Sequence, residues 1–211
     1  MGGGAPGAQS LGGQASRPRA SGGGRGRGRR GAEMGELTDA TGAALPAVEA
    51  PSADLLRAYG DMAFLAFRSP RHGAMSVGEL RRYLEPPLTH GQFRLFRFDG
   101  VPRGMYTWAW LTPEAERRLI VGDPLDPEDW AAGERLWIVD LIAPYRGLTS
   151  SMVRWVMVPG HFTDRSFLFR RVDSENRTRR IVHIDFRRAR LSKVMDEAAF
   201  LAAQPRLPPG R

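Results

Sequence analysis

The stretch Glu128-Asp129-Trp130-Ala131-Ala132-Gly133-Glu134-Arg135-Leu136-Trp137-Ile138-Val139-Asp140-Leu141-Ile142-Ala143-Pro144 decides how this chain folds. Its apolar run from Leu136 to Ala143 contains a single carboxylate, that of Asp140. Because the run is apolar on both alternating faces, it predicts a β-strand that is buried on both sides. A carboxylate in such a strand is costly unless it is paired. The sequence therefore predicts a partner for Asp140.

A candidate partner lies upstream in Ser69-Pro70-Arg71-His72. An apolar stripe at helical spacing runs from Leu55 to Ala66, and Ser52 is a suitable N-cap for that helix. Since a residue before proline avoids the helical region, the helix is expected to end near Ser69. His72 is then expected on the loop that follows. A buried aspartate and a loop histidine suggest an acid–base pair.

The rest of the chain predicts alternating helices and strands. Further strands are expected at 93–98, 105–111, 167–172 and 181–186, and helices at 77–84, from 112, at 126–133, at 149–158 and at 192–203. Prolines 86 and 87 are expected to end the second helix, and the connection 99–104 looks longer than a tight hairpin. The order predicts an α/β fold: a mixed, largely antiparallel sheet flanked by helices, similar to the GCN5-related N-acetyltransferase fold.

Composition divides the chain into two parts. Residues 1–45 form a Gly/Ala/Arg-rich tail that is expected to be disordered, because it holds more than half of the 25 glycines and few large apolar side chains. Residues 46–205 are expected to fold as one domain.

The charge, the cysteine content and the apolar runs of the chain indicate which partner and which compartment suit the protein. The net charge is +8, every basic residue except Lys193 is arginine, and there is no cysteine. The basic charge favours an acidic partner. No apolar run is long enough to span a membrane, and no signal peptide is visible. A cytoplasmic protein without integral membrane association is therefore expected.

The residues resemble the RTX toxin-activating lysine acyltransferases of the haemolysin-activator type. The resemblance covers roughly residues 55–200. It rests on two short motifs, Ser69-Pro70-x-His72 and Trp108-Ala109-x-Leu111. It rests also on a longer pattern, Glu128-Asp129-Trp130-x-x-Gly133-x-Arg135-x-Trp137-x-x-Asp140-x-Ile142-Ala143-Pro144. The chain departs from the family pattern at Arg71, where an apolar residue is common.

The resemblance implies a function and a set of site residues. Such enzymes move a fatty acyl chain from acyl carrier protein to internal lysines of an RTX-type protoxin. The family's catalytic histidine and aspartate fall on His72 and Asp140, and its nearby serine falls on Ser69. The acyl-phosphopantetheine of acyl carrier protein is the donor substrate, no tightly bound cofactor or metal is implied, and a homodimer is implied.

These residue types suit the chemistry. A lysine amine has a pKa of about 10.4 and is mostly protonated at neutral pH, so a base near pKa ~6.5 helps it to attack a thioester. Asp140 would fix the histidine tautomer. Two alternatives stay open: Asp140 orients the lysine itself, or His72 carries the acyl group covalently. Backbone N–H groups near 145–147 are expected to hold the thioester oxygen.

Two other functions compete with this one. The same fold could use coenzyme A or another acceptor, although residues 144–150 lack the glycine-rich spacing of a pyrophosphate loop. A non-enzymatic nucleic-acid-binding protein could use the Gly/Arg run at 22–30 and the basic groups Arg179-Arg180 and Arg187-Arg188-Ala189-Arg190.

Overall fold

The computed structural model describes residues 51–173, 175–188 and 192–204, so the expectation of a disordered tail at 1–45 lies outside the described residues. The elements, in chain order, are α1 (Ala53–Ala66), α2 (Pro70–Gly73), α3 (Val77–Thr89), β1 (Phe93–Phe98), β2 (Val101–Leu111), α4 (Pro113–Val121), the 3-10 helix η2 (Pro127–Ala131), β3 (Arg135–Ile142), α5 (Leu148–Val156), β4 (Ser166–Val172), β5 (Thr178–Asp185), β6 (Ser192–Met195) and α6 (Glu197–Ala202).

One six-stranded sheet carries the domain, in the strand order β1-β2-β3-β4-β5-β6. Neighbouring strands are antiparallel except β3 and β4, which run parallel and are joined through α5. The parallel ladder is short: it pairs Trp137 with Leu168 and Ile138 with Phe169. This confirms the predicted mixed, largely antiparallel α/β fold of the GCN5-related type.

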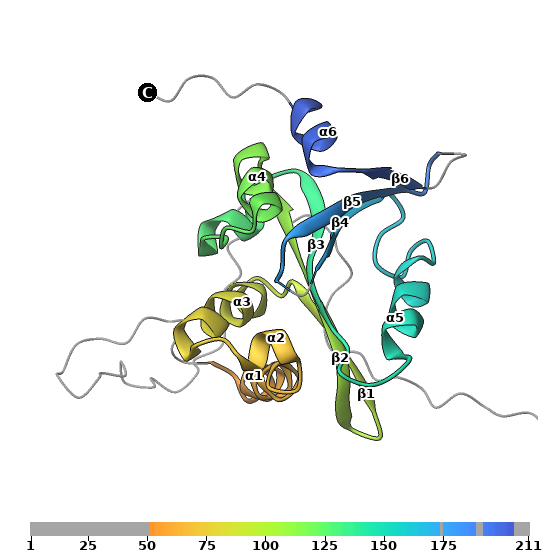
Figure 1. The fold of residues 1–211 in the computed structure, drawn as a ribbon. Helices are drawn as coiled ribbons and strands as arrows, with labels where there is room; N and C mark the ends of the chain where they lie inside the picture. The colour runs from red at the N-terminus through yellow and green to blue at the C-terminus, as the bar shows by residue number, and fades with distance from the viewer. Residues whose placement is uncertain (1–50, 174, 189–191, 205–211) are drawn as a thin grey trace, which may run out of the picture.

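Helices cover both faces of the sheet (Figure 1). On one face, α1 and α3 pack on β1 and β2 through residues such as Met62, Leu84 and Met105, and α4 and α6 continue that layer. On the other face, α5 packs on an aromatic cluster built around Tyr106 and Phe162. The sheet therefore separates the α1–α4 layer from α5. No helix among the described residues is long and apolar enough to span a lipid bilayer.

A β-bulge interrupts β3 beside its carboxylate. Thr107 of β2 pairs with Asp140, but the next residue, Trp108, pairs with Ile138, so Val139 has no partner of its own. Ile138 and Leu141 pack on the α5 side, whereas Val139 and Ile142 pack on the side of α1 and α4. Because of the bulge, the side chains of Val139 and Asp140 lie on the same side of the sheet. The carboxylate therefore faces the layer that contains α2.

Two of the expected boundaries are wrong near prolines. The β1–β2 connection is a tight hairpin, because Asp99 (φ 52°) and Gly100 (φ 75°) both adopt the left-handed conformation that a two-residue turn requires. The extra length is absorbed within β2, where the register shifts opposite Phe96 and Arg97. Helix α3 continues to Thr89, because burial of 86–88 outweighs the two backbone hydrogen bonds that the prolines cannot donate.

The expected helix at 192–203 is also wrong in its first half. Residues 192–195 pair with β5 as the edge strand β6. Helix α6 begins after Asp196, whose side chain accepts a hydrogen bond from the N–H of Ala199. An N-cap at this position ends the strand and starts the helix within one residue.

Candidate active site

His72 belongs to α2, a single helical turn, and not to a loop as expected. Ser69 is extended (ψ 123°), as a residue before proline must be, and this ends the preceding helical segment. Pro70 then stands at the first position of α2, where its fixed φ favours a new turn. The proline therefore both separates the helices and begins the turn that presents His72.

The three site residues predicted from the sequence meet in space. The Nε2 atom of His72 lies 2.6 Å from Oδ2 of Asp140, and its Nδ1 atom lies 2.8 Å from Oγ of Ser69. His72 is 3% exposed, so neither ring nitrogen faces open solvent. Because an ionised carboxylate can only accept, Nε2 carries the proton in the bond to Asp140, and Nδ1 accepts from the Ser69 hydroxyl. Nδ1 is thus the basic nitrogen of the pair.

Asp140 is held in its ionised form. Burial raises the pKa of its carboxyl, but the hydrogen bond and charge of His72, the guanidinium of Arg71 and the N–H of Leu141 outweigh this, so the pKa lies below its ordinary value. The Leu141 N–H donates to Oδ1 over 2.9 Å. An ionised Asp140 stabilises a protonated imidazole beside it.

An apolar cavity reaches Asp140 of this pair, and His72 is not among its lining residues. Its volume is about 230 Å³, and it lies where β3 and β4 diverge next to α5. Apolar walls come from all three elements, mainly from Ile138, Leu141, Val153, Val156, Met157, Phe167 and Phe169. Asp140 and Arg71 lie on the polar part of the wall. The cavity suits an apolar chain whose reactive end meets Asp140.

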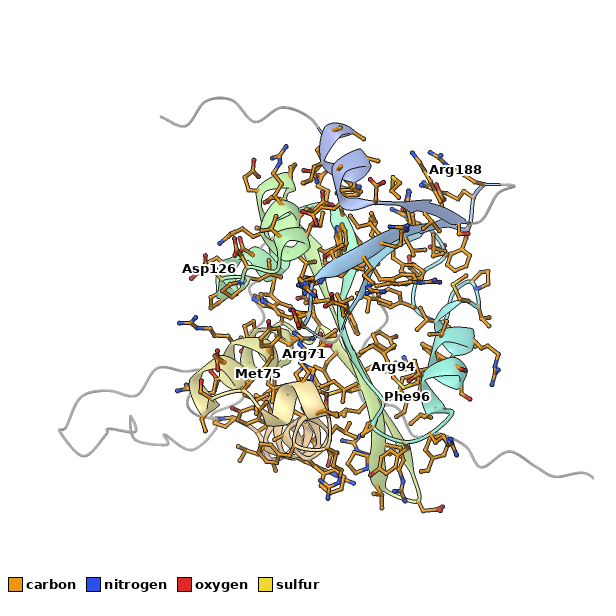
Figure 2. All side chains as sticks on the ribbon, viewed as in Figure 1. Arg71, Met75, Arg94, Phe96, Asp126 and Arg188 are labelled. Carbon is orange, nitrogen blue, oxygen red and sulfur yellow. The ribbon has the colours of Figure 1, made fainter. Side chains whose placement is uncertain are left out.

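Arg71 and Arg170 are site residues whose importance the sequence did not reveal. Five arginines, at positions 57, 68, 71, 81 and 82, lie on or next to α1, α2 and α3. Arg71 alone among them lines this cavity, and Figure 2 shows it between α2 and the sheet. Arg57, Arg68, Arg81 and Arg82 are exposed on α1, after it and on α3. The only available signal was the departure of Arg71 from the family pattern.

Other candidate sites are weaker. In the described parts of the chain, no group of three or more His, Asp or Glu side chains could hold a metal ion. The basic pair Arg187 and Arg188, offered above for nucleic acid, both bind the carboxylate of Asp185, over 3.1 and 3.0 Å. Partial neutralisation of these cations weakens that alternative. His183 is half-buried in β5 and has a pKa lowered mainly by burial.

The fold and the site together define a mixed α/β protein of the acyltransferase type, with a His–Asp pair whose aspartate lines an apolar cavity. The model of the RTX toxin acyltransferase family (HlyC) matches residues 52–185, so the chain belongs to that family. The match contains every residue of the site described above.

Curated relatives bear toxin-activating names. The RTX-II toxin-activating lysine-acyltransferase ApxIIC of Actinobacillus pleuropneumoniae is 39% identical over 87 residues, which is 41% of this chain and 54% of that protein. The protein-lysine palmitoyltransferase CyaC of Bordetella bronchiseptica is 32% identical over 122 residues, 56% of this chain and 66% of that protein. The leukotoxin-activating lysine-acyltransferase LtxC of Aggregatibacter actinomycetemcomitans is 36% identical over 87 residues, 41% of this chain and 52% of that protein. The chain therefore spans between about half and two thirds of these relatives.

Proposed function

We propose that this protein is a protein-lysine fatty acyltransferase that moves an acyl chain from acyl carrier protein to internal lysines of an RTX-type protoxin. The observation that carries the proposal is the 2.6 Å contact between His72 and Asp140 at the wall of the apolar cavity. Family membership supports it, as do relatives whose names state lysine acylation.

The reaction begins with loss of a proton from the lysine ammonium. Nδ1 of His72 accepts this proton, either from the amine directly or through the Ser69 hydroxyl that now occupies it. Asp140 keeps Nε2–H in place and stabilises the imidazolium that forms. The amine attacks the thioester carbon, the nitrogen of the new C–N bond releases its second proton to water, the C–S bond breaks, and the imidazolium returns the first proton to the phosphopantetheine sulfur. An amide and a free thiol result.

The cavity would hold the acyl chain during this step. Its walls are mostly apolar, so burial of the chain from water contributes to donor binding. Arginines on α1 and α3, which lie beside α2 in Figure 1, give an acidic carrier protein a positive surface to approach. The proposal places the reaction in the cytoplasm, a reducing compartment that suits a cysteine-free chain. A homodimer remains an expectation from the resemblance.

Intact-mass spectrometry of a candidate repeat-containing protoxin tests the proposal. The protoxin is incubated with this protein and an acyl carrier protein loaded with fatty acids of several lengths, with the corresponding acyl-coenzyme A in a parallel arm. We expect a mass gain of one acyl group on a lysine, and its loss with His72→Ala. Transfer from coenzyme A alone would replace the proposed donor, and no transfer by the folded wild type would refute the proposal.

Ser69→Ala tests what the serine contributes to the reaction. If Ser69 only orients Nδ1, its hydrogen bond is worth about 1 kcal/mol, and the rate falls roughly tenfold or less. Complete loss of transfer, with an acyl-serine detected on the wild type after donor alone, would instead make Ser69 a nucleophile.

A further inference from the structure

The guanidinium of Arg71 is largely buried yet makes no hydrogen bond to the residues that the structure describes. Its side chain is 24% exposed, and its Nη2 atom is buried without an acceptor. The nearest carboxylate oxygen, Oδ1 of Asp140, lies 3.6 Å from Nη1, which is beyond hydrogen-bond distance. Tyr83 offers only a ring face, 5.1 Å from the guanidinium carbon. Buried donors of this kind normally have an oxygen partner, so the geometry points to a ligand.

The charges around Arg71 leave this corner of the cavity positive. Arg170 of β4 lines the same cavity, and its Nη1 and Nη2 atoms donate only to neutral oxygens of Asn176 and Thr178. Burial and the nearby Arg71 both lower the pKa of Arg170. Asp140 lies near Arg71, raises the pKa of Arg170 through its charge, and also binds His72. A positive, desolvated corner favours an oxygen that carries negative charge.

Arg71 is better placed for this oxygen than the backbone N–H groups expected for it. Residues 145–147 line a separate pocket between α5 and the β1–β2 hairpin, and they do not line the cavity that Asp140 faces. Arg71 lines that cavity and precedes His72 on the same helical turn. The guanidinium and the imidazole both contact one carboxylate, so an acyl carbon beside the imidazole is within reach of Arg71.

We propose that Arg71 binds the carbonyl oxygen of the thioester and stabilises the oxyanion of the tetrahedral intermediate. The inference rests on the proposed acyl transfer. As the C–N bond to lysine forms, the carbonyl π electrons move to oxygen, which accepts N–H donors of Arg71. When the C=O bond re-forms, the C–S bond breaks, the electron pair leaves on sulfur, and His72 supplies its proton. Arg170 supports this role by adding positive charge behind Arg71.

Steady-state kinetics on the full chain test the proposal with Arg71→Met, Arg71→Lys and the control Arg165→Met, which removes the same charge from an exposed site before β4. Removing one oxyanion donor costs about 10²–10³ in kcat. We therefore expect a loss of this size for Arg71→Met, a KM for acyl carrier protein within about threefold of wild type, and partial recovery with lysine. A raised KM with unchanged kcat, or no change at all, would overturn the inference.

Two further readouts exclude a merely structural role. Guanidinium ion should restore part of the activity of Arg71→Ala, whereas a variant with altered packing would gain nothing. The loss should also persist at higher pH, because an effect exerted only through ionisation of Asp140 would be recovered there.

An infrared measurement decides the inference even if no acceptor is found. With octanoyl-pantetheine labelled with ¹³C at the carbonyl, we expect the wild type to shift the C=O stretch to lower frequency and Arg71→Met to lose that shift. Equal spectra for the two proteins would overturn the inference. Absence of transfer by a wild type that shows the shift would instead count against the proposed lysine acceptor.

Discussion

His72 and Asp140 are 68 residues apart in the chain, yet Nε2 and Oδ2 lie 2.6 Å apart. The contact joins a one-turn helix to the central strand, and it depends on the bulge that turns Asp140 towards that helix. A one-residue change in register would move the carboxylate to the other face of the sheet. The bulge is therefore as much a part of the site as the two side chains.

Asp140→Asn should nearly abolish transfer while leaving the fold intact. An amide has almost the shape of the carboxylate, but it cannot stabilise imidazolium, and the comparable change in a Ser-His-Asp triad costs about 10⁴ in kcat. The measurement is the single-turnover rate of acyl transfer, with circular dichroism as the control for folding. A rate within about tenfold of wild type would show that His72 acts without Asp140.

Gly133→Ala should destabilise the domain strongly. A Cβ atom on Gly133 would overlap the carbonyl group of Leu111, and the Gly133 N–H donates to the Trp110 carbonyl over 2.8 Å, so the backbone cannot easily retreat. We expect a loss of several kcal/mol in the free energy of unfolding, measured with urea. Gly60→Ala on α1 is the matched control, since its Cβ meets nothing within 4 Å. The control should gain up to about 1 kcal/mol, and equal effects of the two changes would contradict this account.

Glu116→Gln should alter how stability depends on pH. Glu116 is fully buried on α4, and it accepts hydrogen bonds from Trp137 Nε1 (2.6 Å) and Arg135 Nη1 (2.9 Å). Burial raises the pKa of its carboxyl, and these partners lower it only in part.

The sign of the effect follows from the raised pKa. The folded protein holds the Glu116 proton more tightly than the unfolded chain does. Proton binding by Glu116 therefore stabilises the fold fully at pH values below the pKa that Glu116 has in the unfolded chain. This stabilisation is lost as the pH rises through the pKa that Glu116 has in the folded protein. The Glu116→Gln variant has no ionisable group at this position, so its stability does not fall in this way as the pH rises. Urea unfolding between about pH 4 and pH 7 should show the variant gaining stability relative to wild type. A constant or opposite difference would mean that the pKa is not raised.

Val153→Phe should shorten the acyl chains that the protein accepts. Val153 lies on α5 and lines the apolar cavity of about 230 Å³, so a larger side chain fills part of it. Transfer rates with long-chain donors should fall much more than transfer rates with short-chain donors. Val158→Phe enlarges an exposed valine just beyond α5, outside the cavity lining, and should leave the chain-length profile unchanged. The same profile for both variants would place the acyl chain elsewhere.

Much of this molecule was predictable from local sequence. The apolar run at 136–142, the caps at Ser52 and Thr112, and the apolar residues of β4 and β5 all specify elements through neighbouring residues. The demand for a partner at Asp140 followed from the cost of burying a carboxylate. The residues made His72 a candidate partner, and the family resemblance singled it out, because composition and periodicity cannot pair residues so far apart.

Other features were decided by tertiary structure alone. The bulge at Val139 depends on how β2 pairs with β3, and the cavity depends on where β3 and β4 diverge beside α5. In the sequence Arg71 stood out only as a departure from the family pattern, and packing beside Tyr83 and Asp140 is what buries its Nη2 atom without an acceptor. Sequence determines which segments are strands or helices because those preferences act over a few residues. The site required long-range packing because burial, charge pairing and cavity shape are properties of segments brought together by the fold.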